Sequence, residues 1–481
     1  MSAELERLAS ACIFPGLDGL TAPDWLRREL DAGLGGVTLF SRNVRDREQL
    51  AGLTGEIRAE RDDALIGIDE EGGDVTRLEV DTGSSYPGNL ALGAVDDVEL
   101  TGRVAASIAT ELVGVGVNLN LAPVADVNTN PRNPVIGVRS FGSDPELVAR
   151  HVAAFVKGHQ ARGVIACAKH FPGHGATELD SHHELPTISI DLDELRRSEL
   201  APFRAAIEAG VAAIMTAHVV VPAVDELSAT ISRAHIDGLL RQELGFTGLV
   251  MTDALEMRAI SATVGVDEGA VLALVAGADA LCLGSDLQED AVSQVRRAIV
   301  GAVRDGRLSE ERLAEAAARV NTAGAWSRQP HSEMHAKAAL DPLIGLTAAR
   351  RALRVEGDVR LTGPAYVVEC VPASTMAADP ARHDLGRIMR EFDPRSDSIR
   401  IDGAGPPAIA AYGQRIVLVV RDPQRHPWEQ SLAERLLTLH PDTVVVDVGY
   451  PDWHPDGAAA RITTFGASRA SLTAVAERLT R

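Results

Sequence analysis

The stretch Val164–His170 reads VIACAKH, five apolar residues followed by a lysine and a histidine. An amphipathic pattern over Pro145–Arg162 precedes this stretch, and Gly163 separates the two. A nearly continuous apolar run of this length is typical of a strand that is covered on both faces, as in a parallel sheet. Glycine is the usual residue just past the end of a helix. The stretch therefore predicts a helix, a cap at Gly163 and a buried strand with polar side chains at its carboxyl end.

The same alternation of helix and strand recurs through about 300 residues of the chain. Eight strand-like runs follow one another: Ala11–Pro15, Gly36–Phe40, Leu65–Glu70, Val117–Val124, Val164–His170, Ala213–His218, Gly248–Asp253 and Ala278–Gly284. Helical patterns separate them: Ala22–Ala32, Asp46–Arg61, Pro145–Arg162, Asp193–Ala209 and Val266–Ala276. Eight regular repeats predict an α/β fold with a closed (β/α)₈ TIM-type barrel. An open, doubly wound sheet is the alternative.

The periodicity stops around Trp326–Asp341, and a second set of elements follows it. These elements are a helix from Gly345, strands at Tyr366–Val371, Ile416–Arg421, Thr443–Val448 and Ile462–Phe465, and a helix over Ser468–Thr480. They predict a smaller α/β sandwich-like domain. We therefore expect a catalytic barrel at residues 1–335, a linker at 336–345 and a C-terminal domain at 346–481.

The balance of charge excludes some classes of partner. Lys and Arg number 47 and Asp and Glu 68, a net charge of −21, and a strongly acidic surface repels nucleic acid and anionic lipid. The N-terminus lacks the pattern of a secretory signal, and no stretch approaches the ~18 apolar residues of a membrane span. Four cysteines lie far apart in apolar runs, at Cys12, Cys167, Cys282 and Cys370. Buried thiols of this kind are typical of a reducing compartment, so we expect a cytoplasmic location. The oligomeric state is not defined.

Polar residues gather at one end of the expected strands. They are Asp69, Asp126, Lys169, His170, His218 and Asp253, each at or just past the carboxyl end of an apolar run. In a barrel these ends open on one mouth, which is the usual face for an active site. The placement therefore predicts that these side chains form a site.

The segment Ala168–Pro186, AKHFPGHGATELDSHHELP, carries four histidines and three acids. One interpretation is a solvated loop. A second is a zinc site, although the HExxH spacing is absent. A third is an acid/base pair, because Asp180 and His182 are two residues apart and point the same way in an extended chain. An aspartate that accepts from one imidazole nitrogen would orient the ring and stabilise its protonated form. We favour the third interpretation.

Two further segments carry candidate chemistry. In VMTDALEM, Val250–Met257, Asp253 ends an apolar strand and is either a helix N-cap or a nucleophile toward an anomeric carbon. In IDEEGGDVTRL, Ile68–Leu78, Asp69 and Arg77 can bind hydroxyl groups. The alternatives for this second segment are a salt-bridged loop and a magnesium site.

These motifs occur in a fixed order: GGVTLFSRN, IDEEGG…TRL, LAPVADVN, IGVRSFG, KHFPGHG…DSHHELP, MTAHV and VMTDALEM. Together they resemble glycoside hydrolase family 3, in particular its N-acetyl-β-glucosaminidase (NagZ-like) branch. The resemblance runs through most of the first 290 residues or so. The C-terminal part resembles the second domain of the family more loosely.

The resemblance implies a role for each matched residue. Asp253 matches the nucleophile, His182 the acid/base and Asp180 its partner. The positions that line the sugar subsite are matched by Asp69, Arg77, Arg139, Lys169, His170 and His218. Glu70 and Asp74 depart from the pattern, since Gln and Arg are common there, and we expect both to add negative charge near the mouth.

The implied activity is that of a retaining, exo-acting β-N-acetylglucosaminidase that needs no cofactor or metal. Its substrates would be small carbohydrates, such as cell-wall (muropeptide) or chitin fragments. Two alternatives stay open. A neutral histidine repels an anion less than a glutamate would, so phosphate could replace water and make the chain a phosphorylase. The barrel could also bind sugar without catalysis.

Overall fold

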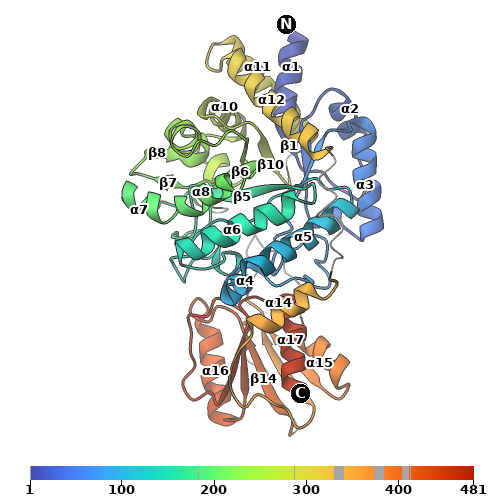
Figure 1. Ribbon diagram of the computed structural model, residues 1–481, viewed down its shortest axis with the longest axis vertical. Coiled ribbons are helices and arrows are strands. Elements are labelled where there is room, and N and C mark those ends of the chain that lie inside the picture. Colours follow the sequence, from blue (N-terminus) through green and yellow to red (C-terminus); the bar gives the residue numbers. More distant parts are fainter. Residues whose placement is uncertain are drawn as a thin grey trace. The chain divides into compact units, whose positions relative to one another are not determined.

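The computed structural model describes residues 2–181, 184–286, 288–329, 341–372, 384–403, 411 and 413–481. The chain forms two compact units (Figure 1). The barrel unit comprises Met1–Glu70, Thr101–Asn133 and Ser143–Leu340, and the second unit comprises Glu71–Leu100, Pro134–Gly142 and Asp341–Arg481. Two short segments from the first part of the chain thus belong with the C-terminal part. The domain limits expected from the sequence stay a prediction.

Parallel strands form the centre of the barrel unit. One sheet contains, in spatial order, β2 (Gly36–Leu39), β3 (Leu65–Ile68), β4 (Leu119–Asn120), β5 (Ile165–Phe171), β6 (Ala213–Thr216) and β9 (Leu249–Thr252). A second, two-stranded sheet pairs β1 (Ile13–Pro15) with β10 (Leu281–Gly284), also in parallel. Each of the eight runs predicted from the sequence overlaps one of these strands, and only β5 extends beyond its run, by one residue.

The two sheets of the barrel unit are connected along β9 and β10. A parallel bridge joins Met251 to Ala280, and the amide of Thr252 donates to the carbonyl of Ala280 over 2.9 Å. Between β1 and β2 the structure has no ladder, although the amide of Gly35 donates to Ser10. The parallel sheet is therefore curled and barrel-like rather than open, which confirms the α/β class.

Alternate residues of these strands form one buried apolar cluster. It contains Phe14, Leu65, Leu119, Leu121, Ile165, Cys167, Ala213, Met215, Leu249, Met251, Ala280 and Cys282. Because side chains two residues apart on a strand point the same way, residues such as Ile165 and Cys167 fill the interior of the curled sheet. Each fully buried large apolar side chain contributes roughly 1.5–3 kcal/mol. This core fixes the strand ends on which the candidate site is built.

Helices pack on the outside of these strands. They are α1 (Ser2–Ala11), α2 (Asp24–Asp31), α3 (Arg47–Glu60), α5 (Val98–Gly114), α6 (Pro145–Gln160), α7 (Leu192–Arg197), α8 (Leu200–Glu208), a π-helix (Ala234–Glu243), α9 (Arg258–Ser261), α10 (Val266–Ala276), α11 (Glu289–Arg304) and α12 (Glu310–Ser327). The side chains of Asp46, Asp144 and Asp191 accept backbone N–H groups at three helix starts. Among the helices that the structure describes, none is long and apolar enough to span a membrane.

The sequence prediction is wrong at two places in this unit. The single helix expected over Asp193–Ala209 is two helices, because Pro202 has no N–H to donate to the carbonyl of Ser198 and cannot continue the first one. After β6 the chain also forms a short antiparallel hairpin, β7 (Val220–Val221) and β8 (Asp225–Ser228). It was not predicted because Asp225 and Glu226 make its second strand polar.

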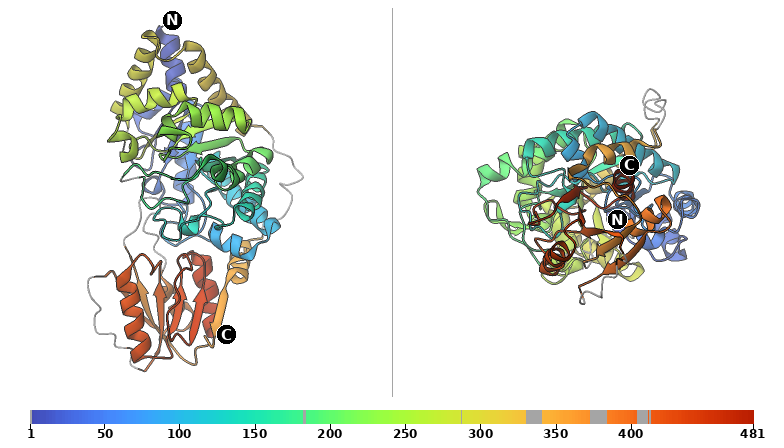
Figure 2. Two further views of the ribbon diagram at one scale, coloured as in Figure 1. Left: turned by 90° about the vertical axis from the view of Figure 1, so that its left-hand side faces the viewer. Right: turned by 90° about the horizontal axis from the view of Figure 1, so that it is seen from below.

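The second unit contains one six-stranded sheet. Its spatial order is β11 (Arg354–Gly357), β16 (Ala460–Thr463), β15 (Val444–Asp447), β14 (Arg415–Val420), β12 (Ala365–Cys370) and β13 (Asp397–Ile401), and only β11 is antiparallel to its neighbour. The helices are α4 (Asn89–Val95), α14 (Ile344–Ala352), α15 (Leu385–Phe392), α16 (Pro427–Leu439) and α17 (Arg469–Thr480). The strands lie between helices on either side (Figure 2, left).

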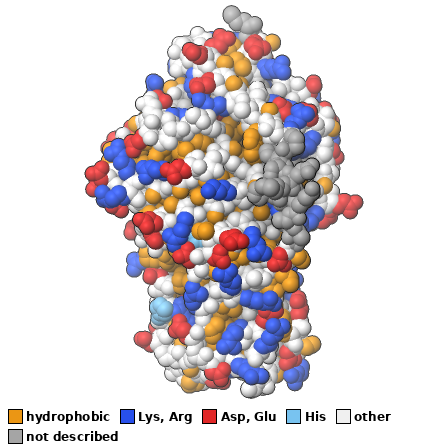
Figure 3. Space-filling model, in the orientation of Figure 1, with side chains coloured by type: hydrophobic (Ala, Val, Ile, Leu, Met, Phe, Trp, Pro, Cys, Tyr) orange, Lys and Arg blue, Asp and Glu red, His pale blue; other side chains and the backbone are white. Residues whose placement is uncertain are grey.

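Both faces of this sheet are covered, as the sequence predicts for a layered α/β domain. Val417 and Val446 pack with Leu385 of α15 and Val475 of α17, while Leu418 and Val445 pack with Leu432 of α16. The edge strands β11 and β13 were not predicted, because their residues are largely exposed and lack the apolar run of a central strand. On the face shown in Figure 3, acidic and basic side chains are interspersed.

Candidate active site

The polar residues predicted to gather at the strand ends of the barrel unit do lie there. Asp69 follows β3 directly, and Lys169 and His170 lie near the carboxyl end of β5. His218 comes two residues after β6, and Asp253 follows β9 directly. Because these strands are parallel, their carboxyl ends open on one side of the sheet. The fold thus places this set of side chains at one end of the barrel unit.

Lys169 and Asp69 form an ion pair between two strands of the barrel unit. The ammonium Nζ lies 2.6 Å from Oδ1 of Asp69, and the two side chains are 3% and 16% exposed. Burial makes such a pair sensitive to its geometry, since each charge relies on the other. The pair offers a donor and an acceptor in fixed positions, which suits the recognition of neighbouring hydroxyl groups.

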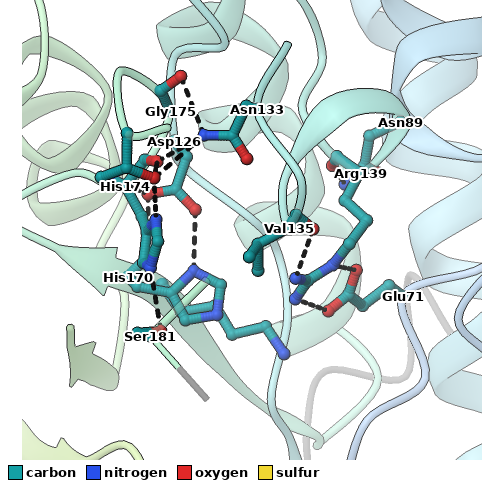
Figure 4. Close-up of polar contacts among 12 residues, drawn as sticks. Glu71, Asn89, Asp126, Asn133, Val135, Arg139, His170, His174, Gly175 and Ser181 are labelled. Atoms are coloured by element: carbon teal, nitrogen blue, oxygen red, sulfur yellow. Dashed lines mark hydrogen bonds and ion pairs between the residues drawn. The ribbon is translucent and has the colours of Figure 1, made fainter. Parts of the chain in front are cut away.

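Asp126 organises the end of β5 (Figure 4). Its fully buried carboxylate accepts from the ring Nδ1 of His170 over 2.7 Å, from the amide of His170 over 3.2 Å and from the amide of His174 over 2.8 Å. Burial alone would raise the pKa of Asp126, but the charge and hydrogen bond of His170 hold it below its ordinary value. Asp126 therefore fixes the imidazole of His170 and the start of the loop after β5.

His174 orders the loop that leads to the predicted acid/base. Its Nδ1 lies 2.9 Å from the hydroxyl of Thr177 and its Nε2 lies 3.0 Å from the hydroxyl of Ser181. Burial lowers the pKa of His174 to about 4, so its ring is neutral at pH 7. The side-chain amide of Asn133 donates to the carbonyl of His174 over 2.8 Å. These contacts fix the chain as far as Ser181.

The predicted Asp180–His182 pair stays a prediction. Asp180 is half-buried, and its carbonyl accepts from the amide of Glu184 over 3.1 Å. His182 and its neighbour His183 lie outside the described residues.

Asp253 and His218 meet at the end of β9. The Oδ1 atom of Asp253 accepts from the amide of Ala254 over 2.8 Å, and Nε2 of His218 lies 3.0 Å from the carbonyl of the same alanine. The Nδ1 of His218 lies 2.7 Å from the hydroxyl of Thr230. The next helix, α9, begins at Arg258 after Met257, so the N-cap interpretation of Asp253 is wrong. His218 thus contacts the carbonyl of Ala254, the residue whose amide orients the Asp253 carboxylate.

The remaining subsite candidates, Arg77 and Arg139, belong to the second unit, and both are buried. Arg139 forms a two-pronged ion pair with Glu71: Nε lies 3.0 Å from Oε2 and Nη2 lies 2.8 Å from Oε1 (Figure 4). Its Nη1 donates to the carbonyl of Val135 over 3.1 Å. Paired N–H···O bonds of this kind fix the plane of a guanidinium group. Arg139 is thus held rigidly.

The expectation that Asp74 adds negative charge is wrong. Its buried carboxylate pairs with Arg421, and its Oδ1 accepts from the amide of Ala467 over 2.8 Å. The salt-bridged interpretation of Ile68–Leu78 therefore describes Asp74 and Glu71 correctly. Arg421 lies 347 residues further along the chain, so no local pattern could have shown the pairing.

Sequence reasoning gave no role to two residues that shape this region, Asn133 and Glu199. Glu199 is buried beside Gly173 of the loop after β5, where an added Cβ would lie 2.2 Å from the Glu199 carboxyl. Burial, with a smaller effect of Asp126, raises the pKa of Glu199 to about 8. No motif marks either residue. Within the described ranges, no group of three His, Cys, Asp or Glu side chains could hold a metal ion.

Comparison with known proteins gives the class of enzyme. Residues 24–323 match the model of the glycosyl hydrolase family 3 N-terminal domain. The chain is thus a glycoside hydrolase. It belongs to glycoside hydrolase family 3, which confirms the resemblance drawn from its motifs.

The relatives are named for one activity. β-Hexosaminidase A of Pseudoalteromonas piscicida is 35% identical over 314 residues, which are 60% of this chain and 52% of that protein. The chain therefore spans about half the length of this relative. The β-hexosaminidase of Neisseria meningitidis serogroup C is 39% identical over 274 residues, 55% of this chain and 75% of that one.

Solved structures resemble the chain over almost its whole length. The family 3 β-N-acetylglucosaminidase of Paenibacillus sp. FPU-7 has a TM-score of 0.89 and is 35% identical, and the match covers 99% of this chain and 96% of that one. A β-glucoside phosphorylase has a TM-score of 0.78 at 20% identity, which shows the shared fold alone.

Proposed function

We propose that this chain removes terminal β-linked N-acetylglucosamine from small glycosides by hydrolysis, with retention of the anomeric configuration. The observation that carries the proposal is the likeness to the Paenibacillus β-N-acetylglucosaminidase over nearly the full length of both chains. The strand-end arrangement around Asp253 supports it, because a carboxylate oriented by a backbone amide is suited to nucleophilic attack.

In the proposed reaction, a carboxylate oxygen of Asp253 attacks the anomeric carbon. The amide of Ala254, bonded to Oδ1, fixes the carboxylate for this attack. The C–O bond to the leaving group breaks as protonated His182 donates a proton to the departing oxygen. Neutral His182 then takes a proton from water, which attacks the glycosyl ester and releases the sugar and Asp253. Asp180 orients the imidazole. A retaining mechanism requires about 5–5.5 Å between the two groups.

Most of the other groups bind the sugar in this proposal. The Lys169–Asp69 pair binds neighbouring hydroxyls with one donor and one acceptor. His170 donates through Nδ1 to Asp126, which directs its Nε2 to a hydroxyl of the substrate. His218, whose two ring nitrogens contact Thr230 and Ala254, supports Asp253 rather than the sugar. Arg77 and Arg139 stay proposed sugar ligands. Aromatic residues form 4% of the chain, which favours a small exo-acting pocket over a stacking cleft for polymers.

We also propose that the enzyme acts in the cytoplasm on cell-wall or chitin fragments. All four cysteines are free and buried, which agrees with a reducing compartment. Burial raises the pKa of Cys167 and of Cys282 to about 12, so these thiols are inert.

The test is the release of nitrophenol from an aryl N-acetyl-β-glucosaminide, with and without phosphate. Release that does not depend on phosphate, with β-configured N-acetylglucosamine as the first product by NMR, is the expected result. Formation of a sugar 1-phosphate would instead make the enzyme a phosphorylase. No release would redirect the proposal to another β-glycoside or to a sugar-binding role. We expect a chelator to leave the rate unchanged.

A further inference from the structure

Asp74 connects the loop after β3 to the C-terminal sheet within the second unit. Its side chain is 3% exposed, and both of its oxygens are used. Oδ1 accepts from the amide of Ala467 over 2.8 Å, and Oδ2 pairs with Nη2 of Arg421. A buried carboxylate with both an ion pair and an amide hydrogen bond is held in position, because removing one member of a buried ion pair is strongly destabilising.

The two partners of Asp74 follow the carboxyl ends of β14 and β16, the two parallel strands on either side of β15. Arg421 follows β14 directly, and its own amide donates to the carboxyl of Glu429 over 2.7 Å. Ala467 follows β16 after a turn in which the hydroxyl of Thr464 donates to the carbonyl of Gly466 over 2.7 Å. Carboxyl ends of parallel strands are where α/β sheets present their functional groups. Here the group that they bind is a side chain of the same polypeptide.

From Asp74 the connection continues to Glu71 through a tight turn. The amide of Glu71 donates to the carbonyl of Val75 over 3.1 Å, and the amide of Val75 donates to Gly72 over 3.3 Å. Gly73 has a φ of 63°, and a Cβ there would lie 2.4 Å from the Cα of Gly88. The turn packs closely against Gly88 and joins Asp74 to Glu71 over three residues.

Glu71 in turn holds Arg139 through two hydrogen bonds of 2.8 and 3.0 Å. Glu71, Asp74, Arg139 and Gly466 line one cavity of about 10 Å³. A space of this size is about that of a single water molecule. The ion pairs Glu71–Arg139 and Asp74–Arg421 therefore belong to one compact polar cluster.

We propose that Arg421 and the Ala467 amide, acting through Asp74 and Glu71, position Arg139 for the sugar. We call these five residues the Asp74 anchor. Arg421 is then a positioning residue that the C-terminal segment supplies, and it lies outside residues 24–323 that match the family model. The inference rests on the proposed function, because Arg139 is a sugar ligand only within it.

The test compares Arg421→Met with a matched control, Asp447→Asn. Asp447 also forms a buried ion pair in the second unit, with Arg461 at 2.7 Å, but it belongs to β15 and has no hydrogen bond to the turn after β3. Arg421→Met is expected to raise KM for the aryl glycoside roughly 2- to 30-fold, with kcat changed less than about twofold. Asp447→Asn is expected to lower the Tm and leave KM unchanged. Arg421→Lys keeps the positive charge, so its KM should lie between those of the wild type and Arg421→Met.

Two further measurements keep the result decisive. Asp74→Asn combined with Arg421→Met removes both charges and is expected to fold even where a single change does not. Its effect on KM should be smaller than the product of the single effects, since both act through one contact. Hydrogen exchange of residues 72–78 should be faster in Arg421→Met than in Asp447→Asn, whether or not the enzyme is active.

If the wild-type enzyme released no nitrophenol, the proposed function would be overturned. The hydrogen-exchange experiment would still show whether Arg421 orders residues 72–78. Unchanged exchange in Arg421→Met, or a KM equal to that of the control, would overturn the anchor itself.

Discussion

The Nδ1 atom of His170 lies 2.7 Å from Oδ2 of Asp126, a carboxylate that is fully buried. The same carboxylate also accepts from the amides of His170 and His174, so it joins the imidazole to the backbone of the loop after β5. We predict that Asp126→Asn lowers the free energy of unfolding at pH 7 by about 3 kcal/mol or more, because an amide cannot replace all three contacts. Urea unfolding measures this loss.

The matched control is Asp97→Asn, which removes a carboxylate paired with Arg351 at the surface, where the side chains are 33% and 48% exposed. Its cost should stay within about 1 kcal/mol. The pKa of Asp126 is held low, so its stabilising effect is present above the ordinary value of 3.8 and is lost as the pH falls through the lower folded pKa. The two variants should therefore converge in strong acid, and equal losses at pH 7 would contradict the prediction.

Replacing the two proposed reacting groups should give different kinetics. Asp253→Ala is expected to lower kcat roughly 10⁴-fold or more, since no nucleophile remains. His182→Ala is expected to lose roughly 10²- to 10⁴-fold. With a nitrophenol leaving group, which needs little protonation, the loss in His182→Ala falls on the second step, so azide should restore turnover and give the β-glycosyl azide.

In the presence of azide, Asp253→Ala should form no β-glycosyl azide. This variant is therefore the internal control. An α-configured azide from His182→Ala, or full activity in Asp253→Ala, would contradict the assignment. The stereochemistry is read by NMR of the isolated azide.

Loss of either member of the Lys169–Asp69 pair should weaken catalysis. Lys169→Met leaves the Asp69 carboxylate without its partner at 2.6 Å and removes a donor to the sugar. We expect kcat/KM to fall roughly 10- to 100-fold for Lys169→Met and for Asp69→Asn. Arg27→Met, which breaks a one-third exposed pair with Glu56, is the control and should leave kcat/KM unchanged. A double variant as active as either single one would show that the two side chains act as a unit.

The strands of the barrel unit could be predicted because their signal is local. An apolar run such as Ile165–Ala168 is followed by polar residues, and Gly163 before it marks the end of a helix. The elements that were missed lack this signal. The exposed edge strand β13 has mixed polarity, and the hairpin β7–β8 contains only two apolar residues in its first strand.

The site could be predicted only in part, for a related reason. Polar residues that end an apolar run can be recognised in the sequence, as at Asp69, Lys169, His170 and Asp253. The groups that hold such residues in place cannot be recognised in this way, because their contacts join distant segments. Asp126 and His170 are 44 residues apart, Glu71 and Arg139 are 68 apart, and Asp74 and Arg421 are 347 apart. The sequence therefore wrongly predicted that Asp74 adds negative charge, because its partner Arg421 is known only from the fold.

Glu199 should make the stability of the enzyme depend on pH above neutrality. Its carboxyl is buried against Gly173, and burial raises its pKa to about 8. The folded state therefore keeps a proton that the unfolded state loses above the ordinary value of 4.5, so stability from this group is complete at low pH and is lost as the pH rises toward 8. One proton corresponds to about 1.4 kcal/mol per pH unit.

Buried neutral histidines make stability rise with pH instead of fall, but they do so over a lower pH range. Burial lowers the pKa of His174 and of His235 to about 4, so their unfolded forms gain protons between that pH and 6.5. The effect of Glu199 is therefore read between pH 6.5 and 8, by urea unfolding of the wild type and of Glu199→Gln. The wild type should lose about 2 kcal/mol more than the variant across this range. Parallel curves would mean that Glu199 is ionised in the folded enzyme, and that its carboxylate tolerates its position beside Asp126 and Gly173.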